Sequence, residues 1–210
     1  MPFTSYKEIS QVLKEYEITS IEDSFIVEIA MDIHPRFRED IELTIKELTF
    51  NQVESVACEM IIFPFLREVY RNYRHKFTLW SHRPISYNEK LSGIPDYIIA
   101  QKSPLGKQVF DQPFGVVVEA KKDDFVLGWG QCLAQMLAAQ KINDLPANIS
   151  TFGIVTNAKL WEFGKLVGQT FTQEIKSYTF SDMDKLLGAL NYVFHQCELV
   201  VADLGSVERL

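Results

Sequence analysis

Two short stretches decide the fold: L-S-G-I-P-D-Y-I-I-A at residues 91–100 and F-G-V-V-V-E-A-K-K-D-D at residues 114–124. Each contains an apolar run of β-branched or aromatic residues bounded by glycine, proline or polar residues, which predicts a β-strand. Asp96 stands at the start of the first predicted strand, whereas Glu119 and Lys121 stand at the end of the second. Three charged side chains are therefore expected at the ends of two strands.

The second predicted strand is apolar on both faces, which favours a position in the middle of a sheet. Because alternate residues of a strand share a face, Glu119 and Lys121 are expected to lie on one face with Val117. An unpaired carboxylate or ammonium is costly in such a place. Mutual attraction could compensate these two charges, but a carboxylate from Asp96 together with a bound cation would explain all three.

The order Pro95-Asp96, a spacer and Glu119-x-Lys121 resembles the PD-(D/E)xK nuclease superfamily, whose fold is called restriction-endonuclease-like. The pattern is closest to the N-terminal nuclease region of type I restriction subunits, because G-I-V-T-N-A-K-L-W-E-F at residues 153–163 resembles their strand, turn and strand. Those proteins usually have Asn-Gly where this chain has Asn157-Ala158. The resemblance covers roughly residues 50–170 and implies an α/β (α+β) fold with a central mixed sheet flanked by helices.

The resemblance also implies a metal site and a reaction. Asp96, Glu119 and the carbonyl oxygen of Ala120 match the family's ligands, and such hard oxygen donors suit Mg²⁺, with Mn²⁺ as a substitute. Lys121 matches the family's catalytic lysine, which would orient a water or stabilise charge in the transition state. The predicted function is hydrolysis of phosphodiester bonds, with DNA as the expected substrate, in defence or repair.

Two glutamates compete for a further role at this metal. Glu59 is the only charged residue between Val56 and Leu66, and families with this fold often place a metal-holding glutamate on the helix before the sheet. The rival is Glu54, in the first turns of the same predicted helix, where the helix dipole favours an acid without any function. Glu59 is the candidate ligand, although a helix-edge glutamate that reaches solvent explains it equally well. Pro64 predicts a kink in this helix.

A helix predicted after the Glu119 strand carries Gln131 and Gln135 on one face. In the resembling family a glutamine here commonly approaches the metal or the scissile phosphate, so Gln131 joins the catalytic candidates. An ordinary helix-surface glutamine is the alternative for both residues.

Basic residues suggest where nucleic acid would bind. Arg67, Arg71 and Arg74 follow one another at spacings of four and three, which places them in one stripe of a helix. Together with Lys122 they are the candidate nucleic-acid contacts. The alternative for the stripe is a solvated helix end whose cations favour the dipole's negative pole.

The charge of the chain is unevenly distributed. The formal net charge is −7, but the segment up to Glu59 holds 13 acidic and 5 basic residues, and the remainder holds 15 and 16. We therefore expect an acidic, mostly helical N-terminal elaboration over residues 1–50 and a nuclease-like domain over residues 51–210. Within the elaboration, S-F-I-V-E-I-A-M-D-I at residues 24–33 is expected as a strand or a short buried helix.

Composition places the protein among cytoplasmic globular proteins that do not enter membranes. No stretch approaches the roughly 18 apolar residues of a membrane span, and the N-terminus lacks the pattern of a secretory signal. Three scattered cysteines, Cys58, Cys132 and Cys197, are typical of small core residues in a reducing compartment. The oligomeric state stays open, with a homodimer among the alternatives.

Two other hypotheses remain beside the enzyme. One is a catalytically inactive module of the nuclease fold that binds nucleic acid or a protein partner. The other treats the motif as fortuitous and Glu119–Lys121 as a structural ion pair.

Overall fold

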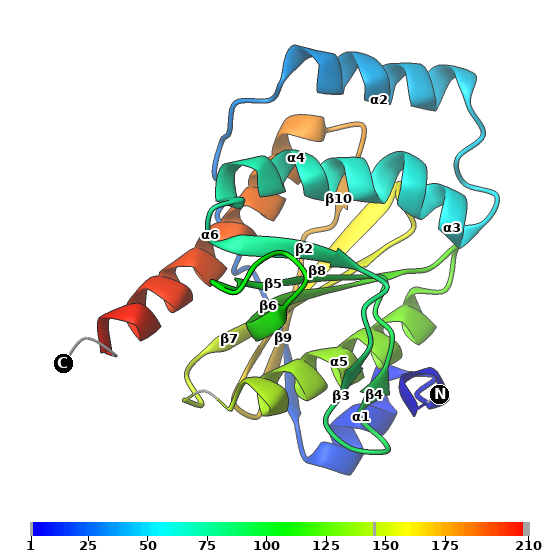
Figure 1. Cartoon of the computed structure of the whole chain (residues 1–210). Coiled ribbons are helices and arrows are strands. Elements are labelled where there is room, and N and C mark those ends of the chain that lie inside the picture. Colours follow the sequence, from blue (N-terminus) through cyan, green and yellow to red (C-terminus); the bar gives the residue numbers. More distant parts are fainter. Residues whose placement is uncertain (1, 145, 208–210) are drawn as a thin grey trace.

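The computed structural model describes residues 2–144 and 146–207, which form a mixed α/β structure with helices on both faces of a large sheet (Figure 1). The helical elements in chain order are η1 (Pro2–Ser5), α1 (Ile9–Tyr16), α2 (Pro35–Glu47), α3 (Glu54–Ala57), η2 (Cys58–Ile62), α4 (Phe63–Tyr73), α5 (Phe125–Asn143) and α6 (Met183–Val207). The strands are β1 (Thr19–Asp23), β2 (Phe77–Ser81), β3 (Ile85–Ser86), β4 (Ser92–Gly93), β5 (Tyr97–Lys102), β6 (Phe110–Ala120), β7 (Ser150–Thr156), β8 (Leu160–Val167), β9 (Thr170–Glu174) and β10 (Tyr178–Thr179).

The main sheet is mixed, as the sequence predicts. Its strand order is β1-β9-β8-β7-β6-β5-β2, with β10 paired to β8. The pairs β6–β7 and β1–β9 are parallel, whereas the other pairs in the sheet are antiparallel. The strands β5 and β6 therefore lie inside the sheet, and for β6, which ends next to Glu119 and Lys121, this is the position that the sequence predicts.

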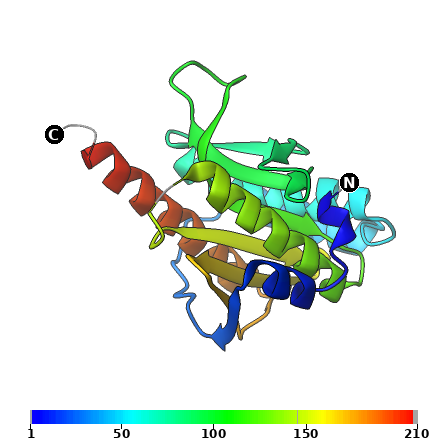
Figure 2. The same ribbon diagram turned by 90° about the horizontal axis from the view of Figure 1, so that it is seen from below.

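Each face of the sheet packs against its own set of helices. Helices α4 and α6 cover one face, with α2 outside α4, while α5 and α1 cover the other (Figures 1 and 2). The side chains of β6 divide between the two hydrophobic cores: Val116, Val118 and Ala120 belong to the α4–α6 side, and Val117 belongs to the α5 side. This alternation confirms the predicted faces of the strand and puts Glu119 under α5.

The antiparallel strands β2 and β5 are joined by a long connection that ends at Asp96. Strand β2 pairs with β5, with Ser81 opposite Tyr97, so the next residues outward, His82 and Asp96, also come together. The connection between His82 and Asp96 contains the short antiparallel ladder β3–β4. The strand predicted within residues 91–100 is thus present as β5, and the connection from β2 to β5 carries a second small sheet.

The helix predicted to contain Glu54, Glu59 and Pro64 is continuous but irregular. The N–H of Phe63 bonds to the carbonyl of Cys58, five residues back, so η2 is a π-helical segment placed directly before Pro64. A proline lacks the N–H that an α-helix would use at this point, and a π-bulge absorbs such a break in the hydrogen-bond ladder. The distortion expected at Pro64 therefore occurs as a change of helix type.

The N-terminal 50 residues are part of the same cores. Strand β1 adds a parallel strand to the edge of the sheet, so the segment is not only helical. Phe3, Tyr6, Val12 and Ile18 pack on the α5 side, and a second group packs on the opposite side, consisting of Ile26, Phe37, Ile41 and Phe50. The acidic elaboration is integrated with the rest of the fold.

Residues 24–33 form neither of the two expected structures. They run as extended chain without helix or strand. The buried carboxylate of Glu174 accepts hydrogen bonds from the N–H groups of Phe25 and Ile26, each at 2.8 Å, and Ile29 N–H bonds to the carbonyl of Gly188. These bonds satisfy backbone groups that a sheet or helix would otherwise pair.

Among the described residues, no helix combines the length and apolar character needed to cross a membrane.

Candidate active site at the end of strand β6

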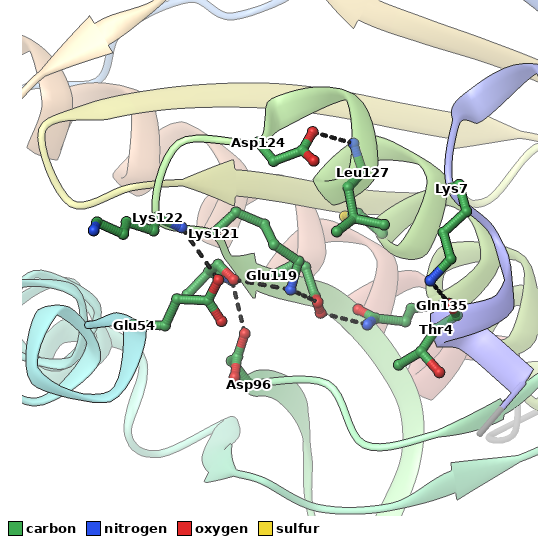
Figure 3. Close-up of polar contacts among 12 residues, drawn as sticks. Thr4, Lys7, Glu54, Asp96, Glu119, Lys121, Lys122, Asp124, Leu127 and Gln135 are labelled. Atoms are coloured by element: carbon green, nitrogen blue, oxygen red, sulfur yellow. Dashed lines mark hydrogen bonds and ion pairs between the residues drawn. The ribbon is translucent and has the colours of Figure 1, made fainter. Parts of the chain in front are cut away.

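The site is built where β5 begins and where β6 and β7 end (Figure 3). Asp96 immediately precedes β5, and its Oδ2 accepts a hydrogen bond of 2.7 Å from the main-chain N–H of Ala120 on β6. Ala120 belongs to the ladder with β7, in which it pairs with Thr156. The Asp96 carboxylate is thereby fixed against the strand that carries Glu119 and Lys121.

Glu119 is buried and makes a hydrogen bond through each carboxylate oxygen. Its Oε1 lies 2.6 Å from Nζ of Lys121, and its Oε2 accepts a hydrogen bond of 2.5 Å from Nε2 of Gln135 on α5. Only 7% of the Glu119 side chain and 12% of the Lys121 side chain are exposed. Both side chains lie on the same strand face, as the sequence predicts.

The Lys121 ammonium also donates to the carbonyl of Ala120, at 3.1 Å. One positive charge therefore contacts two of the three atoms expected as metal ligands, Glu119 Oε1 and Ala120 O. Within the described residues, no three side chains of the His, Cys, Asp and Glu types gather as a cation site. The donor set is two carboxylates and one carbonyl, which are the hard oxygen ligands that Mg²⁺ and Mn²⁺ accept.

Burial is the largest cause that raises the pKa values of both acids. For Glu119, burial is the largest cause and the negative charge of Asp96 the next, so its pKa rises to about 7 although Lys121 opposes the shift. For Asp96, burial raises the pKa and the hydrogen bond from Ala120 and the charge of Lys121 oppose it. Burial lowers the pKa of Lys121, but the carboxylate of Glu119 more than offsets this effect, so the net pKa is raised. The site holds more negative charge than its own lysine neutralises.

Glu54, not Glu59, lies at this corner. Oε1 of Glu54 accepts a hydrogen bond of 3.2 Å from the N–H of Lys122, directly after the motif (Figure 3). Its negative charge also contributes to raising the pKa values of Asp96 and Lys121. Glu59 is exposed on η2 and lines a neighbouring cavity. Glu54, whose position the helix dipole alone could explain, is thus the glutamate near Asp96.

Helix α5 approaches the site closely because of Gly128. A Cβ at this position would lie 2.6 Å from Cγ1 of Val155 and 3.1 Å from Cγ of Lys121. Asp124 begins the helix by accepting a hydrogen bond of 2.9 Å from the N–H of Leu127. With α5 beginning at Asp124, Gln135 reaches Glu119. Gln131 is buried one turn nearer the N-terminal end of the helix. The glutamine that contacts the motif is therefore Gln135.

His82 is a site residue that sequence reasoning missed. Its Nε2 lies 3.5 Å from Oδ1 of Asp96, its N–H bonds to the Asp96 carbonyl at 2.9 Å, and its Nδ1 lies 2.7 Å from Oγ of Ser81. Its φ of 50° is a left-handed conformation that residues other than glycine adopt rarely and that recurs at functional sites. Antiparallel pairing of residues 77–81 with the strand after Asp96 was the signal that could have found it.

The arginine stripe separates into residues with different roles. Arg71 donates to both oxygens of the buried Glu68, at 3.1 and 2.9 Å, and Glu68 also accepts from the N–H of His34. Arg67 is exposed, with its guanidinium 5.7 Å from the Phe63 ring. Arg74 and Lys122 are exposed as well. Arg71 thus serves the packing of α4 against the segment before α2.

Comparison with models of known protein families gave no match, and comparison with curated proteins gave none either.

Proposed function

We propose that the protein is a metal-dependent nuclease of the restriction-endonuclease-like kind, acting on phosphodiester bonds of DNA. The observation that carries this proposal is the meeting of Asp96, Glu119 and Lys121 at the ends of two adjacent central strands. Two acids with raised pKa values and one lysine in a buried corner are expensive to maintain without a ligand. A bound cation would compensate the excess negative charge.

The residues present fit a hard divalent cation. Asp96, Glu119 and the carbonyl of Ala120 would hold Mg²⁺ or Mn²⁺, and Glu54 supplies the nearest further carboxylate. When bound, such a cation supplies Lewis acidity, which neutralises phosphate charge and makes water a better nucleophile. The Lys121 ammonium in this structure touches the same oxygens, so a positive charge is already favourable at this position.

The protein's own groups have distinct tasks in this reaction. The hydrogen bond from Ala120 N–H orients Asp96, and Gln135 holds Oε2 of Glu119 so that the other oxygen faces Lys121. With Glu119 and the Ala120 carbonyl as ligands of a cation, the Lys121 ammonium would donate to water or to a phosphate oxygen. Preorganised donors of this kind act mainly on the charge that develops in the transition state.

A second candidate is a nuclease-fold module that binds nucleic acid or a partner without cleaving. One observation favours it: both Glu119 oxygens already have partners in the protein, Lys121 and Gln135. A buried ion pair of this kind can persist without catalysis, because each partner neutralises the other.

Cleavage assays separate the two candidates. Purified protein is incubated with single-stranded, duplex and branched DNA and with RNA, in Mg²⁺, in Mn²⁺ and in EDTA. The nuclease predicts cleavage that requires the cation and disappears in Asp96→Asn, which keeps an acceptor for Ala120 N–H but removes the charge. Binding without cleavage in every condition, unchanged by Asp96→Asn, would establish the binding module instead.

A further inference from the structure

A cavity of about 330 Å³ opens beside Asp96, between the helical segment η2–α4 and the strands β2 and β5. Its lining residues are Ser55, Cys58, Glu59, Phe63, Ser81, His82 and Tyr97. His82 joins it to the proposed active site, because Nε2 of this residue is 3.5 Å from Oδ1 of Asp96. Any group in the cavity would therefore adjoin a phosphate placed at Asp96.

Three of the residues that line the cavity carry rings: Phe63, His82 and the largely buried Tyr97. The rings of Phe63 and Tyr97 are stacked with centroids 6.1 Å apart and planes at 25°, and the His82 ring lies 6.1 Å from Tyr97 at 63°. Small-molecule sites in proteins are typically clefts or cavities of roughly 300–1,000 Å³. Flat π-systems of this kind accept nucleobases in proteins that bind single strands, since every base offers a π-face.

The charge at the cavity favours a base over a phosphate. Glu59 lines it, and no ion pair joins this carboxylate to another residue in the described part of the chain. A carboxylate repels phosphate but accepts a hydrogen bond from the exocyclic amino group of a base, as in recognition of cytosine N4. The hydroxyl-bearing Ser55 and Ser81 add further polar edges.

A cation lies next to the ring of Phe63. The Arg67 guanidinium stands 5.7 Å from the centroid of the Phe63 ring and is exposed. A strand that runs from Asp96 across the cavity would reach this cation after the base. The order acidic site, aromatic cavity and arginine therefore matches phosphate, base and phosphate.

We propose that this cavity binds one unstacked nucleobase that carries an exocyclic amino group, next to the phosphate at Asp96. This inference rests on the proposed nuclease function and deepens it, because a base within continuous duplex is unavailable unless it is extruded. The preferred substrate is therefore single-stranded DNA or an unpaired end. Glu59 serves as the selecting acceptor, which is a different role from the metal ligand expected of it.

The test compares two labelled single strands of the same sequence, one containing dC and the other dU at each of those positions. Fluorescence anisotropy measures binding to the full chain with Ca²⁺ in place of Mg²⁺, and a gel checks that the strands stay intact. Wild-type protein should prefer the dC strand by about tenfold, the size expected for one good base-edge hydrogen-bond pair. A blunt duplex of the dC strand should bind more weakly than the dC strand alone.

Three variants locate the effect. Glu59→Gln should bring the dC/dU ratio close to one, because an amide both donates and accepts. Phe63→Leu should weaken both strands about equally. Glu39→Gln, which removes one exposed charge on α2, should leave the ratio unchanged. Circular dichroism checks that each variant is folded.

Different failures have different meanings. The cavity proposal is overturned by a wild-type ratio near one, by a ratio that Glu59→Gln leaves unchanged, or by equal affinity for the duplex. In those cases cation-dependent cleavage by the wild type would leave the nuclease function standing. If the wild type neither binds nor cleaves any of the strands, the proposed function fails, and this inference fails with it.

Discussion

Nζ of Lys121 lies 2.6 Å from Oε1 of Glu119, and the other oxygen of that carboxylate is held by Gln135. This arrangement gives a buried glutamate two partners of different kinds. The positively charged Lys121 would compete with a metal cation for the Glu119 carboxylate, whereas the neutral amide of Gln135 would not. The contrast between these two contacts leads to the first two predictions.

Replacing Lys121 by alanine should separate binding from chemistry. Cation affinity should persist or increase, because the competing ammonium is gone. Cleavage should fall by about a hundredfold or more, since the lost donor acts in the transition state. Calorimetric titration with Mn²⁺ and single-turnover cleavage rates provide the two measurements. Lys14→Ala, an exposed lysine on α1, is the control. A loss of cation affinity in parallel with activity would contradict the assigned role.

Replacing Gln135 by methionine should weaken the cation site without emptying it. The change keeps the length and burial of the side chain but removes the donor to Glu119 Oε2. Groups that orient a ligand typically alter metal affinity by about 10–100-fold, so a tenfold loss of Mn²⁺ affinity is expected. Gln140→Met, in the same helix, removes a hydrogen bond to the Gly168 carbonyl instead and should leave this affinity intact. Equal effects of the two variants would argue against a role for Gln135.

Stability of the cation-free protein should depend on pH through Glu119. The folded protein raises the pKa of this group from 4.5 to about 7, so it keeps a proton that the unfolded chain has lost between these values. The contribution to folding is therefore complete below the unfolded pKa and is lost as pH rises to about 7. Across this window the shift corresponds to at most about 3 kcal/mol.

Urea unfolding in EDTA at several pH values measures this effect. The free energy of unfolding of wild type minus that of Glu119→Gln should fall as pH rises, because glutamine has no proton to lose. Carboxylates that do not interact with Glu119 contribute equally to both proteins and cancel in the difference. A difference that is constant from pH 4 to 8 would show that Glu119 has no raised pKa.

The three arginines of the predicted stripe should behave differently when replaced. Arg71→Ala leaves Glu68 buried without its cation and should lower the free energy of unfolding by about 1–3 kcal/mol. The double change Arg67→Ala, Arg74→Ala should keep stability but weaken DNA binding and flatten its dependence on salt. Thermal unfolding and salt-dependent anisotropy report the two properties. A stable Arg71→Ala protein, or an unchanged salt slope in the double variant, would contradict this division.

Much of the fold could be predicted because strand signals are local. The apolar runs before Ala100 and Ala120 became β5 and β6, and alternation along β6 correctly placed Glu119 with Val117. Residues 24–33 could not be predicted, since their backbone is satisfied by Glu174, about 150 positions away in the sequence. A hydrogen-bond acceptor that is far away in the sequence leaves no pattern in the segment whose N–H groups it binds.

The choice between Glu54 and Glu59 failed for a geometric reason. Helical spacing assumes 3.6 residues per turn, so one additional residue rotates the following side chains by about 100°. The Phe63-to-Cys58 bond of η2 introduces such a residue within the segment itself. The apolar surroundings of Glu59 and the helix-dipole position of Glu54 carry no information about this rotation, so they could not say which glutamate lies beside Asp96.

The choice between Gln131 and Gln135 failed for a related reason. The two residues share a helix face but stand about 6 Å apart along the axis, at 1.5 Å per residue. Which one meets Glu119 depends on where α5 begins at Asp124 and on how closely Gly128 approaches Lys121. Neither quantity can be read from spacing.

A crystal of the protein soaked in Mn²⁺ and measured at the manganese absorption edge tests the metal site most directly. We expect one anomalous peak between the carboxylates of Asp96 and Glu119, within bonding distance of the Ala120 carbonyl, with the Lys121 ammonium moved off Glu119. The contradicting result is no peak at millimolar Mn²⁺, with Lys121 still bound to Glu119. That result would make the pair a structural salt bridge.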